Sequence, residues 1–112
     1  MTRYLISFDD GSMDIPEEDL PDADRAAHQV VDEAKRAGAW IFGAGLESQS
    51  ASIVAADGTV SEGPFPETKA VLGGFVIVDV GSREEALEWA GKFAAACRCP
   101  QEVRELLPDP NV

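Results

Sequence analysis

The residue best suited to acid–base chemistry in this sequence is its single histidine, His28. An imidazole has an unperturbed pKa of about 6.5, so it can accept and donate protons near neutrality. His28 lies in a segment of helical periodicity, and Asp24 and Asp32 are four residues away on either side, where side chains of one helix can meet. His28 therefore has two interpretations: it is a general base, or it is an exposed histidine in a local ion pair.

A carboxylate beside His28 would strengthen the first reading, and Glu62 is the candidate. A carboxylate next to an imidazole holds its tautomer and stabilises its charged form. The alternative for Glu62 is an ordinary solvated acid, because the chain contains 21 acidic residues. We therefore take His28 and Glu62 as the candidate catalytic pair and expect their side chains to converge.

A small-molecule pocket would also need apolar walls and a few polar contacts. Aromatic residues in the strand-like segments and in the proline-rich segment are candidates for the walls, although such residues also form plain core. Lys69 could bind a polar substrate or hold its own loop through ion pairs. The candidate substrate-binding residues are Phe8, Trp40, Phe42, Phe65, Lys69 and Phe75.

No metal site and no cofactor are expected. Cys97 and Cys99 have no further cysteines or clustered histidines near them, so we expect two reduced thiols at a helix end. The segment 43–45, Gly-Ala-Gly, lacks the third glycine of a dinucleotide loop and is interpreted as a strand that allows close backbone approach. The acidic residues between Asp9 and Asp19 do not have the spacing of a calcium loop.

The charge balance argues against nucleic acid and anionic membrane partners. The chain has 9 basic and 21 acidic residues and a formal net charge of −12, which phosphate groups would repel. It has no leader-like start and no apolar run near the roughly 20 residues of a membrane helix. We expect a cytoplasmic protein without nucleic-acid or membrane partners.

The elements that would position these residues form one α+β domain over residues 1–112, with 108–112 as a short C-terminal tail. Alternation of Tyr4, Ile6 and Phe8 predicts a first strand with one buried face. Ser82 followed by Glu85 is a capping box that begins a second helix. The predicted strands are 2–9, 40–47, 50–56 with a hairpin extension through 59–61, 75–80 and 101–107, and the first helix is 22–38.

The element order is β-α-β-β-α-β, which is the ferredoxin-like arrangement of two split βαβ units. Right-handed crossovers place both helices on one face of the antiparallel sheet. Segment 75–80 is apolar on both faces, as is typical of a central strand, so the other face of the sheet would be bare. A second copy under two-fold symmetry is the simplest cover, and we expect a homodimer.

The segment Glu62–Lys69, EGPFPETK, followed by LGGF at 72–75 and EEALEWA at 84–90, resembles the YCII-related family in its DGPF-signature branch. The resemblance extends to both ends of the chain, with RYLISF at 3–8 and QEVRE at 101–105. It implies a dimeric α+β barrel made of two ferredoxin-like sheets packed face to face. This sequence has Glu62 where the signature has aspartate, which lengthens the side chain by one methylene.

The same resemblance implies two classes of function. Some family members are known or suspected enzymes on small cyclic compounds, including a dehydrochlorinase, and a histidine–aspartate pair is the proposed catalytic centre. The first hypothesis is therefore a lyase, isomerase or dehydrochlorinase-like enzyme that acts on an unidentified small molecule through His28 and Glu62. The second is a non-catalytic metabolite-sensing or regulatory dimer module, linked to sigma-factor function as other related domains are.

Overall fold

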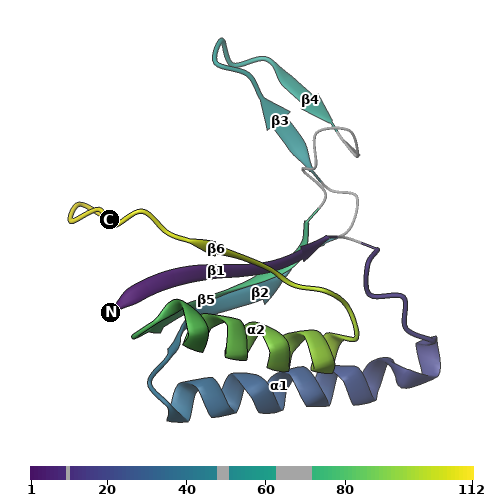
Figure 1. The fold of residues 1–112 in the computed structure, drawn as a ribbon. Helices are drawn as coiled ribbons and strands as arrows, with labels where there is room; N and C mark the ends of the chain where they lie inside the picture. The colour runs from purple at the N-terminus through teal and green to yellow at the C-terminus, as the bar shows by residue number, and fades with distance from the viewer. Residues whose placement is uncertain (10, 48–50, 63–71) are drawn as a thin grey trace.

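The computed structural model describes residues 1–9, 11–47, 51–62 and 72–112. Their fold is α+β: a four-stranded antiparallel sheet of order β2-β5-β1-β6 carries two helices on one face (Figure 1). The strands are β1 (Thr2–Asp9), β2 (Trp40–Gly45), β5 (Leu72–Val80) and β6 (Glu102–Glu105). This architecture is consistent with the predicted ferredoxin-like arrangement.

The two central strands, β1 and β5, present one apolar face to the helices. Tyr4 pairs with Val78 and Ile6 pairs with Val76, so these side chains share that face. Tyr4 is 4%, Ile6 1% and Val78 0% exposed. The prediction that segment 75–80 is a central strand is confirmed, because β5 lies between β1 and β2.

The opposite face of the sheet, called here the open face, is also apolar. Leu5 and Phe42 both pair with Ile77, and Phe75 pairs with Ala44, so all of these side chains point away from the helices. The Phe42 and Phe75 rings lie 6.0 Å apart between centroids, and Phe42 is 57% exposed. The single chain thus has the bare apolar face that the sequence predicts.

The first helix, α1 (Leu20–Arg36), begins before the predicted start at Asp22 and follows the short 3-10 helix η1 (Glu17–Asp19). Pro21 lies in its first turn, where a proline without an N–H is tolerated because that N–H would have no helical partner. The predicted helix start at Asp22 is therefore two residues late. Gly38, with φ of 74°, follows the helix as predicted.

The second helix, α2 (Arg83–Cys97), begins as the capping box predicts. The Glu85 N–H donates to the Ser82 hydroxyl oxygen at 3.2 Å. Phe93, only 4% exposed, packs with Val30 where α1 and α2 meet. The helix ends at Arg98, which has a left-handed φ of 57°.

A hairpin of β3 (Ser52–Val54) and β4 (Val60–Glu62) forms a separate two-stranded sheet. Figure 1 shows it projecting from the side of the main sheet that the helices do not cover. The predicted pairing of segment 50–56 with its hairpin extension 59–61 is confirmed, since β3 and β4 pair across the Asp57-Gly58 turn. The expectation that this segment is a strand of the main sheet is wrong, because the two strands form a sheet of their own. Gly58 has φ of 90°, and the Thr59 N–H donates to Asp57 Oδ1 at 2.9 Å.

Candidate functional site

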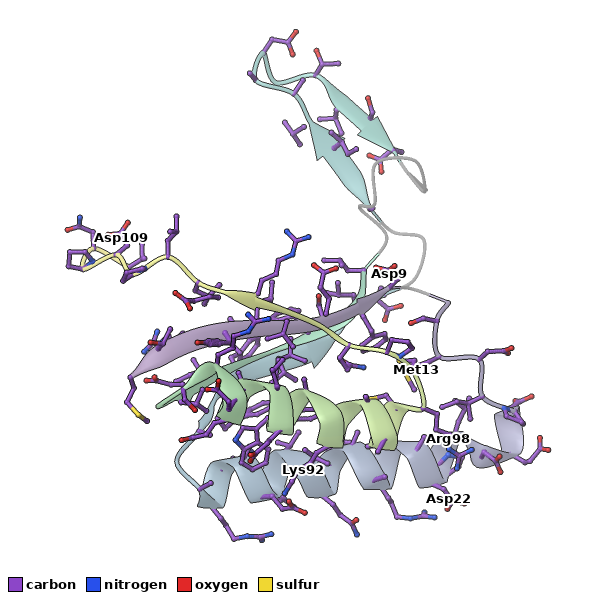
Figure 2. The ribbon with its side chains drawn as sticks, viewed as in Figure 1. Asp9, Met13, Asp22, Lys92, Arg98 and Asp109 are labelled. Carbon is purple, nitrogen blue, oxygen red and sulfur yellow. The ribbon has the colours of Figure 1, made fainter. Side chains whose placement is uncertain are left out.

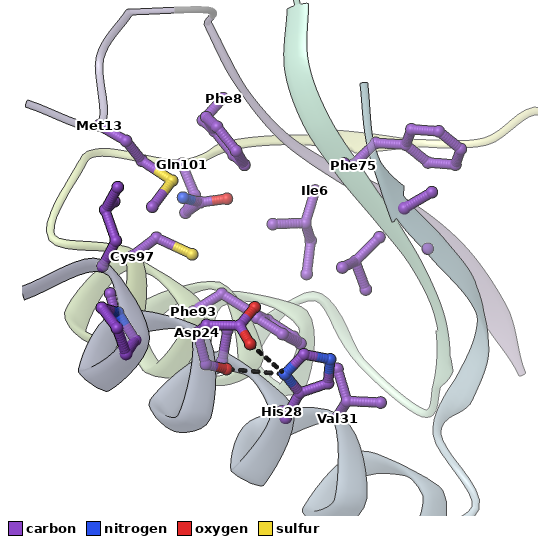
Figure 3. Close-up of a pocket in the computed structure, with 18 of the residues that line it drawn as sticks. Ile6, Phe8, Met13, Asp24, His28, Val31, Phe75, Phe93, Cys97 and Gln101 are labelled. Atoms are coloured by element: carbon purple, nitrogen blue, oxygen red, sulfur yellow. Dashed lines mark hydrogen bonds and ion pairs between the residues drawn. The ribbon is translucent and has the colours of Figure 1, made fainter. Parts of the chain in front are cut away.

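A cavity of about 770 Å³ lies between the helix-facing side of the sheet and the helices (Figure 3). Strands β1, β2 and β5 form one wall, α1 forms another, and Phe93 and Cys97 of α2 close one side. The segment before η1 contributes Met13, and Gln101 at the start of β6 completes the lining. Its size is within the range of small-molecule sites, and most of the lining is apolar.

Two glycines allow aromatic rings to lie against the strands of this wall. A Cβ on Gly43 would lie 2.8 Å from Cη2 of Trp40, and a Cβ on Gly74 would lie 2.9 Å from the Phe8 ring. At Gly43 a Cβ would also lie 2.8 Å from the Phe75 main-chain oxygen, so this position requires a residue without a side chain. At Gly74 a Cβ would force the Phe8 ring to shift. Close backbone approach, predicted for segment 43–45, is confirmed at Gly43.

His28 lies on α1 at the edge of the cavity, and Asp24 one turn earlier is its partner (Figure 3). His28 Nδ1 lies 2.8 Å from the main-chain oxygen of Asp24 and 3.4 Å from its Oδ2. Both side chains are largely exposed, at 71% and 73%. A proton on Nδ1 would be donated to Asp24, and Nε2 would then be the acceptor nitrogen.

The carboxylate beside His28 is therefore the aspartate of the same helix, although the sequence reasoning chose Glu62. Asp24 four residues before His28 was the available signal, because side chains at that spacing meet. Glu62 lies in β4, where its Oε2 accepts a hydrogen bond from the Ser52 hydroxyl at 2.6 Å. It is not among the described residues that line the cavity, and its convergence with His28 stays a prediction.

The predicted aromatic residues lie in different places. Phe8 and Trp40 line the cavity. Phe75 borders it, but its ring points away from the cavity centre (Figure 3), and Phe42 lies on the open face outside the described lining. Phe65 and Lys69 lie outside the described residues, and the substrate contacts of all six residues stay predictions.

Several polar groups of the lining were missed by the sequence reasoning. Gln101 Nε2 lies 3.5 Å from both the main-chain oxygen and the Sγ of Cys99. Cys97 is buried, and this burial, followed by the nearby Cys99, raises the pKa of its thiol, so the thiol stays protonated at neutrality. These residues come from separate elements, so no local pattern in the sequence joins them to His28.

An exposed ion pair joins the end of α2 to the start of α1 beside the cavity. Arg98, the residue that ends α2 (Figure 2), places Nη1 3.1 Å from Oδ2 of Asp19, directly before α1. Leu20 and Glu17, which flank Asp19, both line the cavity. The pair therefore links the end of α2 to the segment that bounds the cavity, although an exposed pair of this kind contributes little stability.

Among the described residues, 1–9, 11–47, 51–62 and 72–112, histidine, cysteine, aspartate and glutamate side chains do not gather in threes that could hold a metal ion. No helix in this part of the chain is both long and apolar enough to cross a lipid bilayer.

Comparison with known proteins places the chain in a family. A solved structure of 5-chloro-2-hydroxyhydroquinone dehydrochlorinase (TftG) from Burkholderia phenoliruptrix, in complex with 2,5-dihydroxybenzoquinone, is similar with a TM-score of 0.55 and 16% sequence identity. The match covers 99% of this chain and 98% of the dehydrochlorinase, and at this identity it shows a shared fold. No curated protein sequence matches the chain. The profile of the YCII-related domain matches residues 4–106, and the chain therefore belongs to the YCII-related family.

Proposed function

We propose that this protein binds a small cyclic compound in the cavity and acts on it by general acid–base chemistry at His28. The observation that carries the proposal is the contact of His28 Nδ1 with Asp24 at the edge of a mostly apolar cavity. An apolar cavity with a few convergent polar groups is the usual form of a small-molecule site.

The geometry supports a base with an oriented ring. Donation from Nδ1–H to the Asp24 main-chain oxygen leaves Nε2 to accept a proton from a bound molecule. The Asp24 carboxylate at 3.4 Å would stabilise the imidazolium that forms. Proton removal is the step that lyase, isomerase and dehydrochlorinase reactions share, so the proposal covers that group of reactions.

The similar dehydrochlorinase supports the choice of ligand class. Its name describes a chlorinated, hydroxylated ring as substrate, and its structure contains a dihydroxybenzoquinone. We propose that this chain also takes a ring compound with oxygen substituents, while the particular substrate and reaction differ between proteins that share a fold.

We further propose that the protein works as a homodimer whose two sheets meet through the open face. A contiguous apolar face of this kind is uncommon on a monomer. The open face also holds both charge signs, with Arg3 Nε 3.9 Å from Asp79 Oδ2 and Arg104 paired with Glu102. Two chains of net charge −12 would repel least where such balanced charges meet.

The test begins with a thermal-shift screen of small phenols, quinones and cyclic acids, followed by NMR of the mixtures to detect turnover. For any compound that the protein turns over, H28A should lower the turnover rate by about 100- to 10,000-fold, which is the range contributed by a general base. Unchanged turnover in H28A would contradict the proposed chemistry. Binding without turnover for every compound would favour a binding module.

The partner of His28 is tested by three further variants. D24N should lower turnover, whereas D32N, an exposed aspartate four residues on the other side of His28, is the matched control and should not. E62Q tests the predicted pair of His28 and Glu62. If E62Q loses turnover and D24N does not, Glu62 and not Asp24 is the partner of His28.

A further inference from the structure

We infer that Gln101 is a specificity-determining residue that forms a second polar end of the cavity and selects ring compounds with oxygen substituents at two opposed positions. The inference rests on the proposed function, because it needs a ring compound whose first polar group meets His28. It assigns to Gln101 a role in binding and no role in the chemical step.

The position of Gln101 is the first observation. Gln101 lines the cavity, and Figure 3 shows its side-chain amide directed into it, across the cavity from His28. It directly precedes β6, whereas His28 lies on α1, so the two residues approach the cavity from different elements. A ligand between them would meet one polar group at each end.

The weak contacts of the amide are the second observation. Within the described part of the chain, the hydrogen bonds of the Gln101 amide go only to Cys99, with Nε2 at 3.5 Å from both the main-chain oxygen and Sγ. Both distances are at the outer limit for a hydrogen bond, and sulfur is a weak acceptor. A ligand oxygen would therefore be a better partner for this half-buried amide than the ones it has.

The space between the two ends is apolar. Ile6, Phe8 and Phe93 lie along it (Figure 3). These apolar side chains can pack against a bound ring but cannot form a hydrogen bond with it. A ligand with one oxygen substituent would satisfy His28 and leave the Gln101 amide covered without a partner. Sites built to hydrogen-bond a hydroxyl discriminate strongly against analogues that lack it.

The chemistry of the two ends limits the ligand further. An amide both donates and accepts, so the Gln101 end can take a hydroxyl or a ring carbonyl, whereas neutral His28 with its proton on Nδ1 favours a hydroxyl. The carboxylates of Asp24 and Glu17 also line the cavity and would repel an anionic ligand. Uncharged diols and hydroxyketones of ring compounds are therefore preferred over cyclic carboxylates.

The size of the cavity decides which probes to use. A cavity of about 150 Å³ holds benzene, so one of about 770 Å³ has room for a single or a fused double ring. Two matched pairs cover both lengths: phenol with hydroquinone, and 2-naphthol with 2,6-dihydroxynaphthalene. The members of each pair differ only in the second, opposed hydroxyl.

The experiment measures the affinities of these four compounds by anaerobic titration calorimetry. The original protein should bind the diol of at least one pair about tenfold or more tightly than the mono-ol. Q101L should reduce that preference to about twofold or less, and it should not weaken the binding of the mono-ol, because it removes the amide that a mono-ol leaves without a partner. Q29L, which removes an exposed glutamine of α1 outside the described cavity lining, is the matched control and should keep the preference.

Two outcomes separate this inference from the proposed function. A diol preference that persists in Q101L, while H28A weakens both members of the pair, overturns the role of Gln101 alone. Failure of the original protein to bind any of the four compounds overturns both. If Q101L does not fold, Q101N replaces it, since it retains the amide but shortens the side chain and should still lose most of the hydroquinone preference.

Discussion

Both faces of the main sheet carry apolar side chains, but they differ in what covers them. On the helix-facing side, Ile6 and Val78 are at most 1% exposed, because they share a buried cluster with Ala86 and Ala90 of α2. On the open face, Phe42 is 57% exposed and the neighbouring Leu5 and Ile77 are only half-buried.

The chain's own helices cover one face of the sheet and leave the other face exposed to solvent. The helix-facing side contains the closed core and also the cavity with His28 and Gln101. The open face gains a comparable cover only if another molecule supplies it, as the proposed dimer does.

Ile6→Ala tests the covered face. It should lower the free energy of unfolding by about 2–5 kcal/mol, because it leaves a void among fully buried side chains. Urea unfolding followed by circular dichroism measures it. Leu5→Ala, one residue earlier on the open face, is the control, and an equal or larger loss there at a concentration that keeps the protein monomeric would break the comparison.

Gly43→Ala tests the wall that the covered face gives to the cavity. The new Cβ would meet both Trp40 Cη2 and the Phe75 main-chain oxygen at 2.8 Å, so the unfolding free energy should fall by about 1–3 kcal/mol. Gly45→Ala is matched to it, since a Cβ there has nothing within 4 Å. Equal urea midpoints for the two variants would show that the wall is not tightly packed at Gly43.

Ile77→Asp tests the open face. A charge placed there should raise the dimer dissociation constant about tenfold or more, which corresponds to about 1.4 kcal/mol, without unfolding the chain. Sedimentation velocity over a dilution series measures this. Leu87→Asp, at a 45% exposed position of α2, should leave the association unchanged, and an original protein that is monomeric at micromolar concentration would refute the dimer itself.

The pH dependence of the helix cover has the smallest expected effect. Lys92 Nζ donates a hydrogen bond to Glu33 Oε2 at 2.8 Å. This hydrogen bond, and then the positive charge of Lys92, hold the pKa of Glu33 below its ordinary value. A lowered pKa contributes stability above the ordinary glutamate pKa, and this contribution is lost as the pH falls through the lowered value.

Glu33→Gln should therefore be slightly less stable than the original protein at neutral pH and equally stable in acid. Urea midpoints over this range measure the difference, and one that persisted in acid would mean that Glu33 stabilises the α1–α2 contact by something other than its charge.

Much of the fold could be predicted from local patterns. The period-two alternation of β1 and the capping box at Ser82 depend on neighbouring residues, and both are confirmed. The hairpin through residues 59–61 was predicted as well, but its separation from the main sheet was not, because the strand-like residues 52–54 do not reveal whether they also pair with another strand. The helix start was misplaced because Pro21 ends a helix in some positions and begins one in others.

The site was predictable in part, since His28 and two of the predicted wall residues, Phe8 and Trp40, line the cavity. His28 stood out by its type, and Asp24 was within reach of the same reasoning, because helix geometry alone brings residues four apart together. The single imidazole in an acidic chain, and the alternation that gives both sheet faces apolar side chains, are properties of the sequence. That Gln101 and Cys97 line the cavity with His28, and that the helices cover one face, follow only from the tertiary structure. Such groupings depend on contacts between residues far apart in the chain, for which local periodicity carries no signal.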